Sequence, residues 1–238
     1  MPNAWDDPRI ASGMKQQLLR RRELLQSGKK PLGWKLAFGA PASIERLHTN
    51  APIVGFLLAD AVLRSGATVS VAGWKKPAAE AEIAVYMRKD LGPGAGRDTT
   101  IGAIAGLGAA IEIADVDHPS EDVEGTLVRN IYQRHVILTG CDTTYAGGKL
   151  TGLNALVLRN GVEIANTRDF GALTGELIEN VSHVANVLSF FGETLRADEI
   201  IIAGSITLPI LVEAGETVGF QLEPLEPILV NFAASVYP

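Results

Sequence analysis

The segment from Lys76 to Tyr86 constrains this chain most, because it places two carboxylates inside an otherwise apolar, strand-like run. Side chains alternate between the two faces of a strand, so Glu80 and Glu82 project from the same face. Two carboxylates at this spacing repel each other unless a cation lies between them. Thirty residues after Glu82, Glu112 interrupts a second apolar run. Three hard oxygen donors on rigid strands are the ligands that Mg²⁺ and Mn²⁺ prefer.

The same pattern has a simpler interpretation, because a Glu-x-Glu pair is also typical of the solvent-facing side of an antiparallel sheet. The neighbours on the carboxylate face, Ala78, Ala84 and Tyr86, add no further charge. We therefore expect a half-buried face, on which carboxylates must be paired, hydrogen-bonded or bound to a metal. The sequence pattern alone leaves the solvated face and the metal site both open.

Composition excludes several classes of function. The net charge is −6, and basic residues are scattered apart from Arg20–Arg22 and Lys29–Lys30, so we expect no nucleic-acid partner. No apolar run reaches the about eighteen residues of a membrane-spanning helix, and the N-terminus lacks the apolar core of a signal peptide. A single cysteine, Cys141, excludes an internal disulfide framework and fits a reducing compartment. These features predict a cytoplasmic protein without a membrane partner.

The remaining pattern predicts an α+β protein of many short strands. We expect helices over 9–26, 44–48, 100–106, 121–130 and 174–191. The Asn160-Gly161 pair between alternating runs predicts a hairpin over 156–165 with a type I′ turn. Frequent short strands with few helices favour a mainly antiparallel β architecture with peripheral helices. We interpret residues 1–238 as one catalytic domain in which residues 1–50 form a helical N-terminal, lid-like portion. The other expected strands are 33–39, 53–58, 67–73, the runs around Glu80 and Glu112, 135–139, 199–203, 210–213, 217–222 and 227–232.

Five short motifs follow one another in order along the chain. They are Gly33-Trp34-Lys35, residues 56–60 (FLLAD), residues 80–84 (EAEIA), residues 112–115 (EIAD) and residues 204–207 (GSIT). With these motifs the chain resembles the fumarylacetoacetate hydrolase superfamily, and within it the branch of 2-keto-4-pentenoate hydratase and 4-oxalocrotonate decarboxylase. The resemblance implies a mixed β-roll, a Mg²⁺ or Mn²⁺ ion held by Glu80, Glu82 and Glu112, and a homo-oligomer. It also implies a substrate that is a 2-oxo acid or its dienol form.

The resemblance also implies roles for individual residues. Lys35 would be a second cation that contacts the substrate oxygens or moves a proton, although a surface lysine is the simpler alternative. Asp60 would transfer a proton or pair with Lys35, although it is equally typical of a turn. Ser205 and Thr207 would bind the substrate carboxylate, and Leu58 would contact the substrate.

These expectations favour hydration of a 2-hydroxy-2,4-dienoate to a 4-hydroxy-2-oxo acid. Decarboxylation of a 2-oxo diacid on the same site is an alternative, and a non-catalytic subunit is another. Hydrolysis of an acylpyruvate would need a water-activating pair. The hydrolase branches carry His-x-x-Glu on a lid helix, whereas this chain has Glu45 before His48. These two residues are the candidates for such a pair.

Overall fold

Two β-sheets form the centre of the protein in the computed structural model, which describes residues 3–235. The main sheet runs in the order β2-β1-β10-β5-β6-β7-β3, with β11 beside β5. Its pairs are antiparallel except for β1 with β10 and β3 with β7. Its strands are β1 (Pro31–Ala37), β2 (Ile53–Leu58), β3 (Val62–Leu63), β5 (Pro77–Met87), β6 (Ile104–Asp115), β7 (Gln133–Leu138), β10 (Ile200–Ser205) and β11 (Ile210–Leu211).

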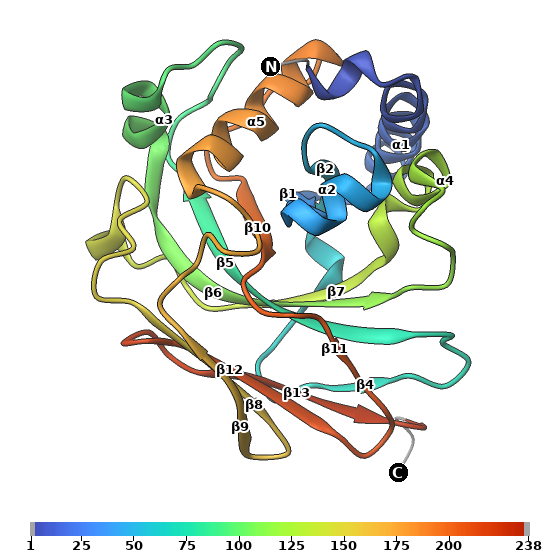
Figure 1. Ribbon diagram of the computed structural model, residues 1–238, viewed down its shortest axis with the longest axis vertical. Helices are drawn as coiled ribbons and strands as arrows, with labels where there is room; N and C mark the ends of the chain where they lie inside the picture. The colour runs from blue at the N-terminus through green and yellow to red at the C-terminus, as the bar shows by residue number, and fades with distance from the viewer. Residues whose placement is uncertain (1–2, 236–238) are drawn as a thin grey trace.

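The second sheet runs in the order β4-β13-β12-β8-β9 and is antiparallel except between β13 and β4. It lies across the main sheet on the side opposite the helices (Figure 1). The hairpin between β8 and β9 turns at Asn160 and Gly161, whose φ values of 52° and 78° confirm the predicted primed turn. The strands are β4 (Thr68–Ser70), β8 (Asn154–Arg159), β9 (Val162–Thr167), β12 (Thr217–Glu223) and β13 (Ile228–Ala233).

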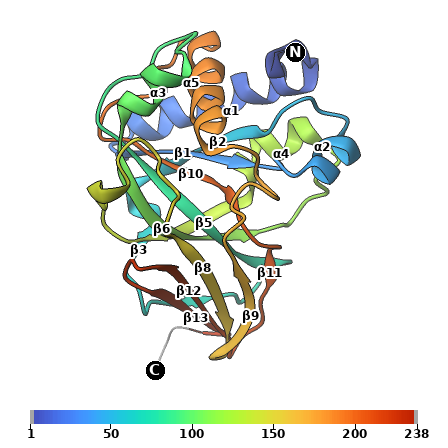
Figure 2. The ribbon, with the colours of Figure 1, turned by 60° about the vertical axis from the view of Figure 1, so that its left-hand side comes forward.

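The helices gather on the other side of the main sheet, as Figure 2 shows from a second direction. They are α1 (Pro8–Gln26), α2 (Pro41–Leu47), α3 (Arg97–Ala103), α4 (Val123–Val128) and α5 (Leu177–Phe190). Four short 3₁₀ turns, η1 (Ala4–Asp6), η2 (Ala59–Ala61), η3 (Asn130–Tyr132) and η4 (Thr143–Tyr145), join some of the elements. None of the helices in the described part of the chain has both the length and the apolar character needed to cross a membrane.

The arrangement confirms the predicted fold, a mainly antiparallel mixed β-roll with peripheral helices. The predicted element boundaries differ in places: the helix expected over 100–106 ends at Ala103, and β3 was not expected. Strand β1 falls within the N-terminal portion 1–50, yet it is an interior strand between β2 and β10. The division into a single domain with a lid-like portion stays a prediction.

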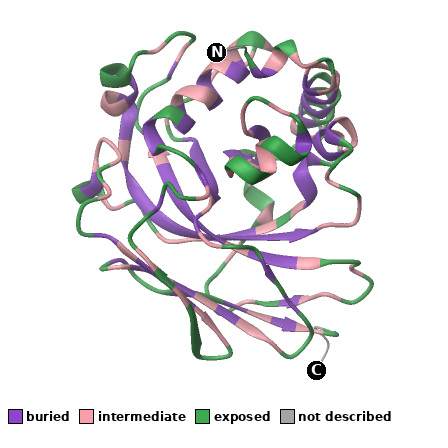
Figure 3. Ribbon diagram, viewed as in Figure 1, coloured by how far each residue is buried: buried purple, intermediate pink, exposed green. Residues whose placement is uncertain are grey.

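One face of the curled main sheet carries a small apolar cluster that matters for the site. Figure 3 shows that most residues of β5, β6 and β10 are buried. Ala84 shares this face with Glu80 and Glu82 by strand alternation, and Ala110 shares it with Glu112. The carboxylates therefore extend a buried face, not a solvated one. The cluster consists of Leu57, Ala84, Ala110, Val136, Ile200 and Ile202.

Candidate active site

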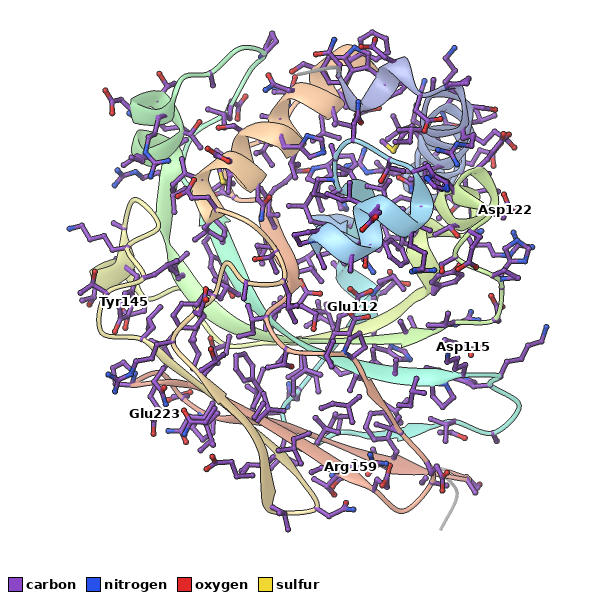
Figure 4. All side chains as sticks on the ribbon, in the orientation of Figure 1. Glu112, Asp115, Asp122, Tyr145, Arg159 and Glu223 are labelled. Carbon is purple, nitrogen blue, oxygen red and sulfur yellow. The ribbon has the colours of Figure 1, made fainter. Side chains whose placement is uncertain are left out.

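Three carboxylates meet on neighbouring strands of the main sheet. The register places Glu80 of β5 directly opposite Glu112 of β6, and Glu82 is the next residue on the same face of β5. Glu82 and Glu112 are each 1% exposed, so the solvated-face alternative is wrong. Figure 4 shows Glu112 on the inner side of the curled sheet, below α2.

Lys35 supplies the one ammonium group that contacts this cluster within the described residues. It is 2% exposed, its Nζ forms an ion pair with Glu112 Oε1, and Nζ also donates to the Ile131 carbonyl at 3.2 Å. Lys35 lies opposite Gly55 of β2, where a Cβ atom would stand 2.9 Å from Lys35 Cγ. Gly55 therefore leaves the room that the lysine side chain needs to reach across the sheet.

A left-handed stretch of backbone orients the Ile131 carbonyl. Asn130, Ile131 and Tyr132 have φ values of 52°, 51° and 63°, a conformation that costs free energy in each non-glycine residue. The Asn130 side chain holds the stretch in place, because it accepts from the Phe56 amide and donates to the Phe56 carbonyl, both at 2.8 Å. The acceptor of Lys35 is thus fixed to β2 by two buried hydrogen bonds.

The electrostatics of the cluster follow from three acids facing one base. Burial, followed by the charge of Glu112, raises the pKa of Glu80 to about 7. Burial also raises the pKa of Glu82 well above its usual value, with Glu112 and Glu80 adding to the shift. Lys35 opposes both shifts. When all three glutamates are ionised, the cluster has three negative charges and the single positive charge of Lys35.

A divalent cation fits this excess of negative charge and the donor type. Glu82 Oε1 is buried without a hydrogen-bond partner, whereas Glu82 Oε2 accepts from the Gly204 amide at 2.7 Å. Carboxylate oxygens on the two neighbouring strands β5 and β6 are ligands of the kind that Mg²⁺ and Mn²⁺ prefer. They are not arranged as a closed cage, since no three acidic, His or Cys side chains in residues 3–235 have metal-ligating spacing. The Lys35 ammonium is ion-paired with Glu112 Oε1. The Lys35 and Glu112 side chains must therefore rotate before Glu112 can bind a metal ion.

A cavity of about 340 Å³ opens beside the cluster. Lys35 and Glu80 line it at the sheet, and α2 and the loop after β10 form further walls. Ser205 and Thr207 both line the cavity, and their substrate-binding role stays a prediction. The Ser205 hydroxyl donates to the Thr207 carbonyl at 2.8 Å, which fixes the turn.

The structure does not bring Asp60 or Leu58 to this cavity. Asp60 is exposed in η2 and forms an ion pair with Lys29, which lowers the pKa of the Asp60 carboxyl. The predicted pairing of Asp60 with Lys35 is therefore wrong. The reason is strand direction: β2 runs antiparallel to β1, so Gly55 lies opposite Lys35 and Leu58 opposite Pro31. At about 3.3 Å per residue, Leu58 is roughly 10 Å farther along β2 than Gly55, and Asp60 follows it in η2.

Helix α2 presents a different face from the one that the sequence suggested. Ser43 and Arg46 line the cavity, whereas Glu45 and His48 are exposed and do not. His48 ends the helix in a left-handed conformation. The candidate water-activating pair is thus not at the cavity.

Several cavity residues were missed by the sequence analysis. Lys76 shares strand alternation with Glu80, which was a usable signal, since side chains two and four residues apart share a face. Asn180 of α5 lines the cavity and donates to the Thr174 carbonyl at 2.9 Å, and nothing in the sequence indicates this. Arg46 lies in the helix predicted over 44–48, between Glu45 and His48, the two residues named as candidates.

The chain is similar along most of its length to enzymes of known activity, although no family model matches it. It is 28% identical over 220 residues to 2-hydroxyhexa-2,4-dienoate hydratase of Comamonas testosteroni, covering 90% of this chain and 82% of that one. It is 26% identical over 219 residues to 4-oxalocrotonate decarboxylase of Pseudomonas putida, covering 91% and 82%. A 4-oxalocrotonate decarboxylase from Pseudomonas putida G7, solved with magnesium and adipate, superposes with a TM-score of 0.85 at 24% identity, over 98% of this chain and 90% of that one.

Proposed function

We propose that the chain is a divalent-metal-dependent lyase of the fumarylacetoacetate hydrolase superfamily, because the curated relatives to which it is similar are hydratases and decarboxylases. Its proposed reaction adds water to a 2-hydroxy-2,4-dienoate and yields a 4-hydroxy-2-oxo acid. One observation carries the proposal: Lys35 and Glu80 line a cavity beside Glu82 and Glu112 on one buried face.

We propose that Glu80, Glu82 and Glu112 hold the ion, which is Mg²⁺ or Mn²⁺. When bound, such an ion supplies Lewis acidity toward the 2-oxygen of the substrate. Lys35 would donate a hydrogen bond or a proton at that oxygen, with the Ile131 carbonyl keeping its Nζ in place.

We propose that the turn with Ser205 and Thr207 binds the substrate carboxylate. Phe38 and Leu208 in the cavity wall would exclude water from the diene. Asp60 has no part in this scheme, since it lies on the surface beside Lys29. A homo-oligomeric state and a cytoplasmic location stay predictions.

Decarboxylation of a 2-oxo diacid is the second candidate, because the chain is also similar to a decarboxylase and the same residues would serve both reactions. Hydrolysis has less support, since Glu45 and His48 do not line the cavity. A non-catalytic subunit would have no need of three carboxylates on a buried face, which oppose folding unless they bind something.

The test is the ultraviolet decay of freshly generated 2-hydroxypenta-2,4-dienoate with Mg²⁺, with Mn²⁺ and with EDTA. We expect metal-dependent decay that yields 4-hydroxy-2-oxopentanoate, and its loss in Glu80→Gln. The matched control is Glu45→Gln, which removes the same charge away from the cavity. Absence of decay when metal is bound would refute the hydratase, and release of CO₂ from 4-oxalocrotonate would then support the decarboxylase.

A further inference from the structure

The outer part of the cavity carries positive charge just before strand β5. Lys76 immediately precedes β5, Ala78 and Glu80 are alternate residues at its start, and all three line the cavity. At about 3.3 Å per residue, Lys76 lies roughly 13 Å along the strand from Glu80. The Lys76 side chain is exposed and takes part in no ion pair within residues 3–235.

Arg46 brings a second cation to the same end. It lines the cavity from α2, and its Nη1 donates to Ser120 Oγ at 2.8 Å and forms an ion pair with Glu121. A second hollow adjoins the cavity here and is lined by Arg46 and Lys76 and also by Asp117 and Glu121. Glu121 offsets part of the Arg46 charge, and the nearby Asp117 lies 3.7 Å from Arg134. Lys76 is therefore the cation with no partner of its own.

The acids are distributed differently. Within the described residues, Glu80 is the only carboxylate that lines the main cavity, and it lies at the Lys35 end. The cavity thus has a metal-binding end at Lys35 and Glu80 and an outer end that carries Lys76 and Arg46. A substrate with one carboxylate would leave Lys76 facing solvent without an anion.

We propose that the substrate of this site is a diacid whose far carboxylate is bound by Lys76, with Arg46 as a second contact. This inference rests on the proposed function, because the 2-oxo carboxylate must occupy the end at Lys35 and Glu80. Lys76 is then a specificity-determining residue, which selects for the second carboxylate without contacting the reacting atoms.

The expected selectivity lies between two limits. A fully exposed ion pair contributes only a few-fold in affinity, and a buried hydrogen bond to a charged group contributes up to about a hundred-fold. Lys76 is exposed but borders a cavity, so we expect about tenfold. The preference should weaken as salt is added, since exposed charges are screened.

Two ligands of equal chain length isolate the effect. 2-Oxoadipate and 2-oxohexanoate share the 2-oxo carboxylate and differ only in the far carboxylate. Their dissociation constants are measured by calorimetry on the full chain with Mn²⁺ present, for the wild type, Lys76→Gln and Lys75→Gln. Lys75 is the matched control, because it is an adjacent exposed lysine that lines neither the cavity nor the hollow.

We expect the wild type and Lys75→Gln to bind 2-oxoadipate about tenfold tighter than 2-oxohexanoate, and Lys76→Gln to bind the two equally. Glu121→Gln should increase the preference, because it frees Arg46. Equal binding of the two ligands by the wild type, or an unchanged preference in Lys76→Gln, would refute the second carboxylate site and leave the proposed function intact. Binding of neither ligand would refute the proposed function, and this inference with it.

Discussion

Replacing Lys35 by Met tests whether the lysine is what stabilises the buried carboxylates. The two side chains have similar volume, so packing is largely kept, and the main loss is the charge. Glu112 is 1% exposed and would lose its ion pair, leaving three carboxylates on one face without an ammonium group. Removal of one partner from a buried ion pair costs about 3–5 kcal/mol. That is a large part of the about 5–15 kcal/mol by which a domain is stable.

A double-mutant cycle separates the ion pair from packing. Lys35→Met with Glu112→Gln removes both charges, and replacing a whole buried pair is often nearly neutral. We expect the double variant to be more stable than Lys35→Met alone by at least about 2 kcal/mol. The assay is urea unfolding at pH 7 with EDTA, compared through midpoints at constant slope.

Metal provides the second readout of the same experiment. The ammonium of Lys35 and a divalent ion compete for Glu112, so Lys35→Met should gain more stability from Mn²⁺ than the wild type does. A ligand at a hundred times its Kd adds about 2.7 kcal/mol. A Lys35→Met loss below about 1 kcal/mol, or strictly additive effects in the cycle, would show that Lys35 does not stabilise Glu112.

Three other predictions address the cluster and its surroundings. The pKa of Glu80 is about 7 in the folded protein against 4.5 ordinarily, so the native state keeps a proton that the unfolded chain has lost. The free energy of unfolding of the metal-free protein should therefore fall between about pH 4.5 and 7, by at most about 3 kcal/mol, and Glu80→Gln should flatten this slope in urea titrations. Glu45→Ala and His48→Ala should leave turnover within about twofold, because neither residue lines the cavity; a loss of a hundred-fold would restore the hydrolase interpretation. Asn130→Ala should destabilise the fold by about 2–3 kcal/mol in thermal unfolding, since it breaks two buried hydrogen bonds, and a change below about 0.5 kcal/mol would contradict this.

The sequence predicts the carboxylate face well because strand alternation is a local property. Glu80, Glu82 and their apolar neighbours need only a strand to share a face, and β5 is that strand. The reach of Lys35 to Glu112 is different, because it depends on the strand order β1-β10-β5-β6. No local pattern gives that order.

The errors at Asp60 and at α2 have the same physical origin. Asp60 follows an apolar strand, as catalytic residues often do, but the pattern does not show which end of β2 lies near Lys35. In α2, a seven-residue helix, packing of the buried Leu47 decides which face meets the cavity. Arg46 lines the cavity, whereas helical periodicity alone would have allowed Glu45 to do so equally well.

The place of β10 between β1 and β5 has a consequence for synthesis of the chain. The strand begins at Ile200, so a ribosome has completed most of the protein before Lys35 and the carboxylates can be held in one sheet. Until then the growing chain carries three acids with neither the lysine nor the Gly204 amide to receive them. Assembly of the site is therefore a late step of folding during translation, followed only by the addition of β11, β12 and β13 among the described strands, and products shortened before β10 should be open to proteases.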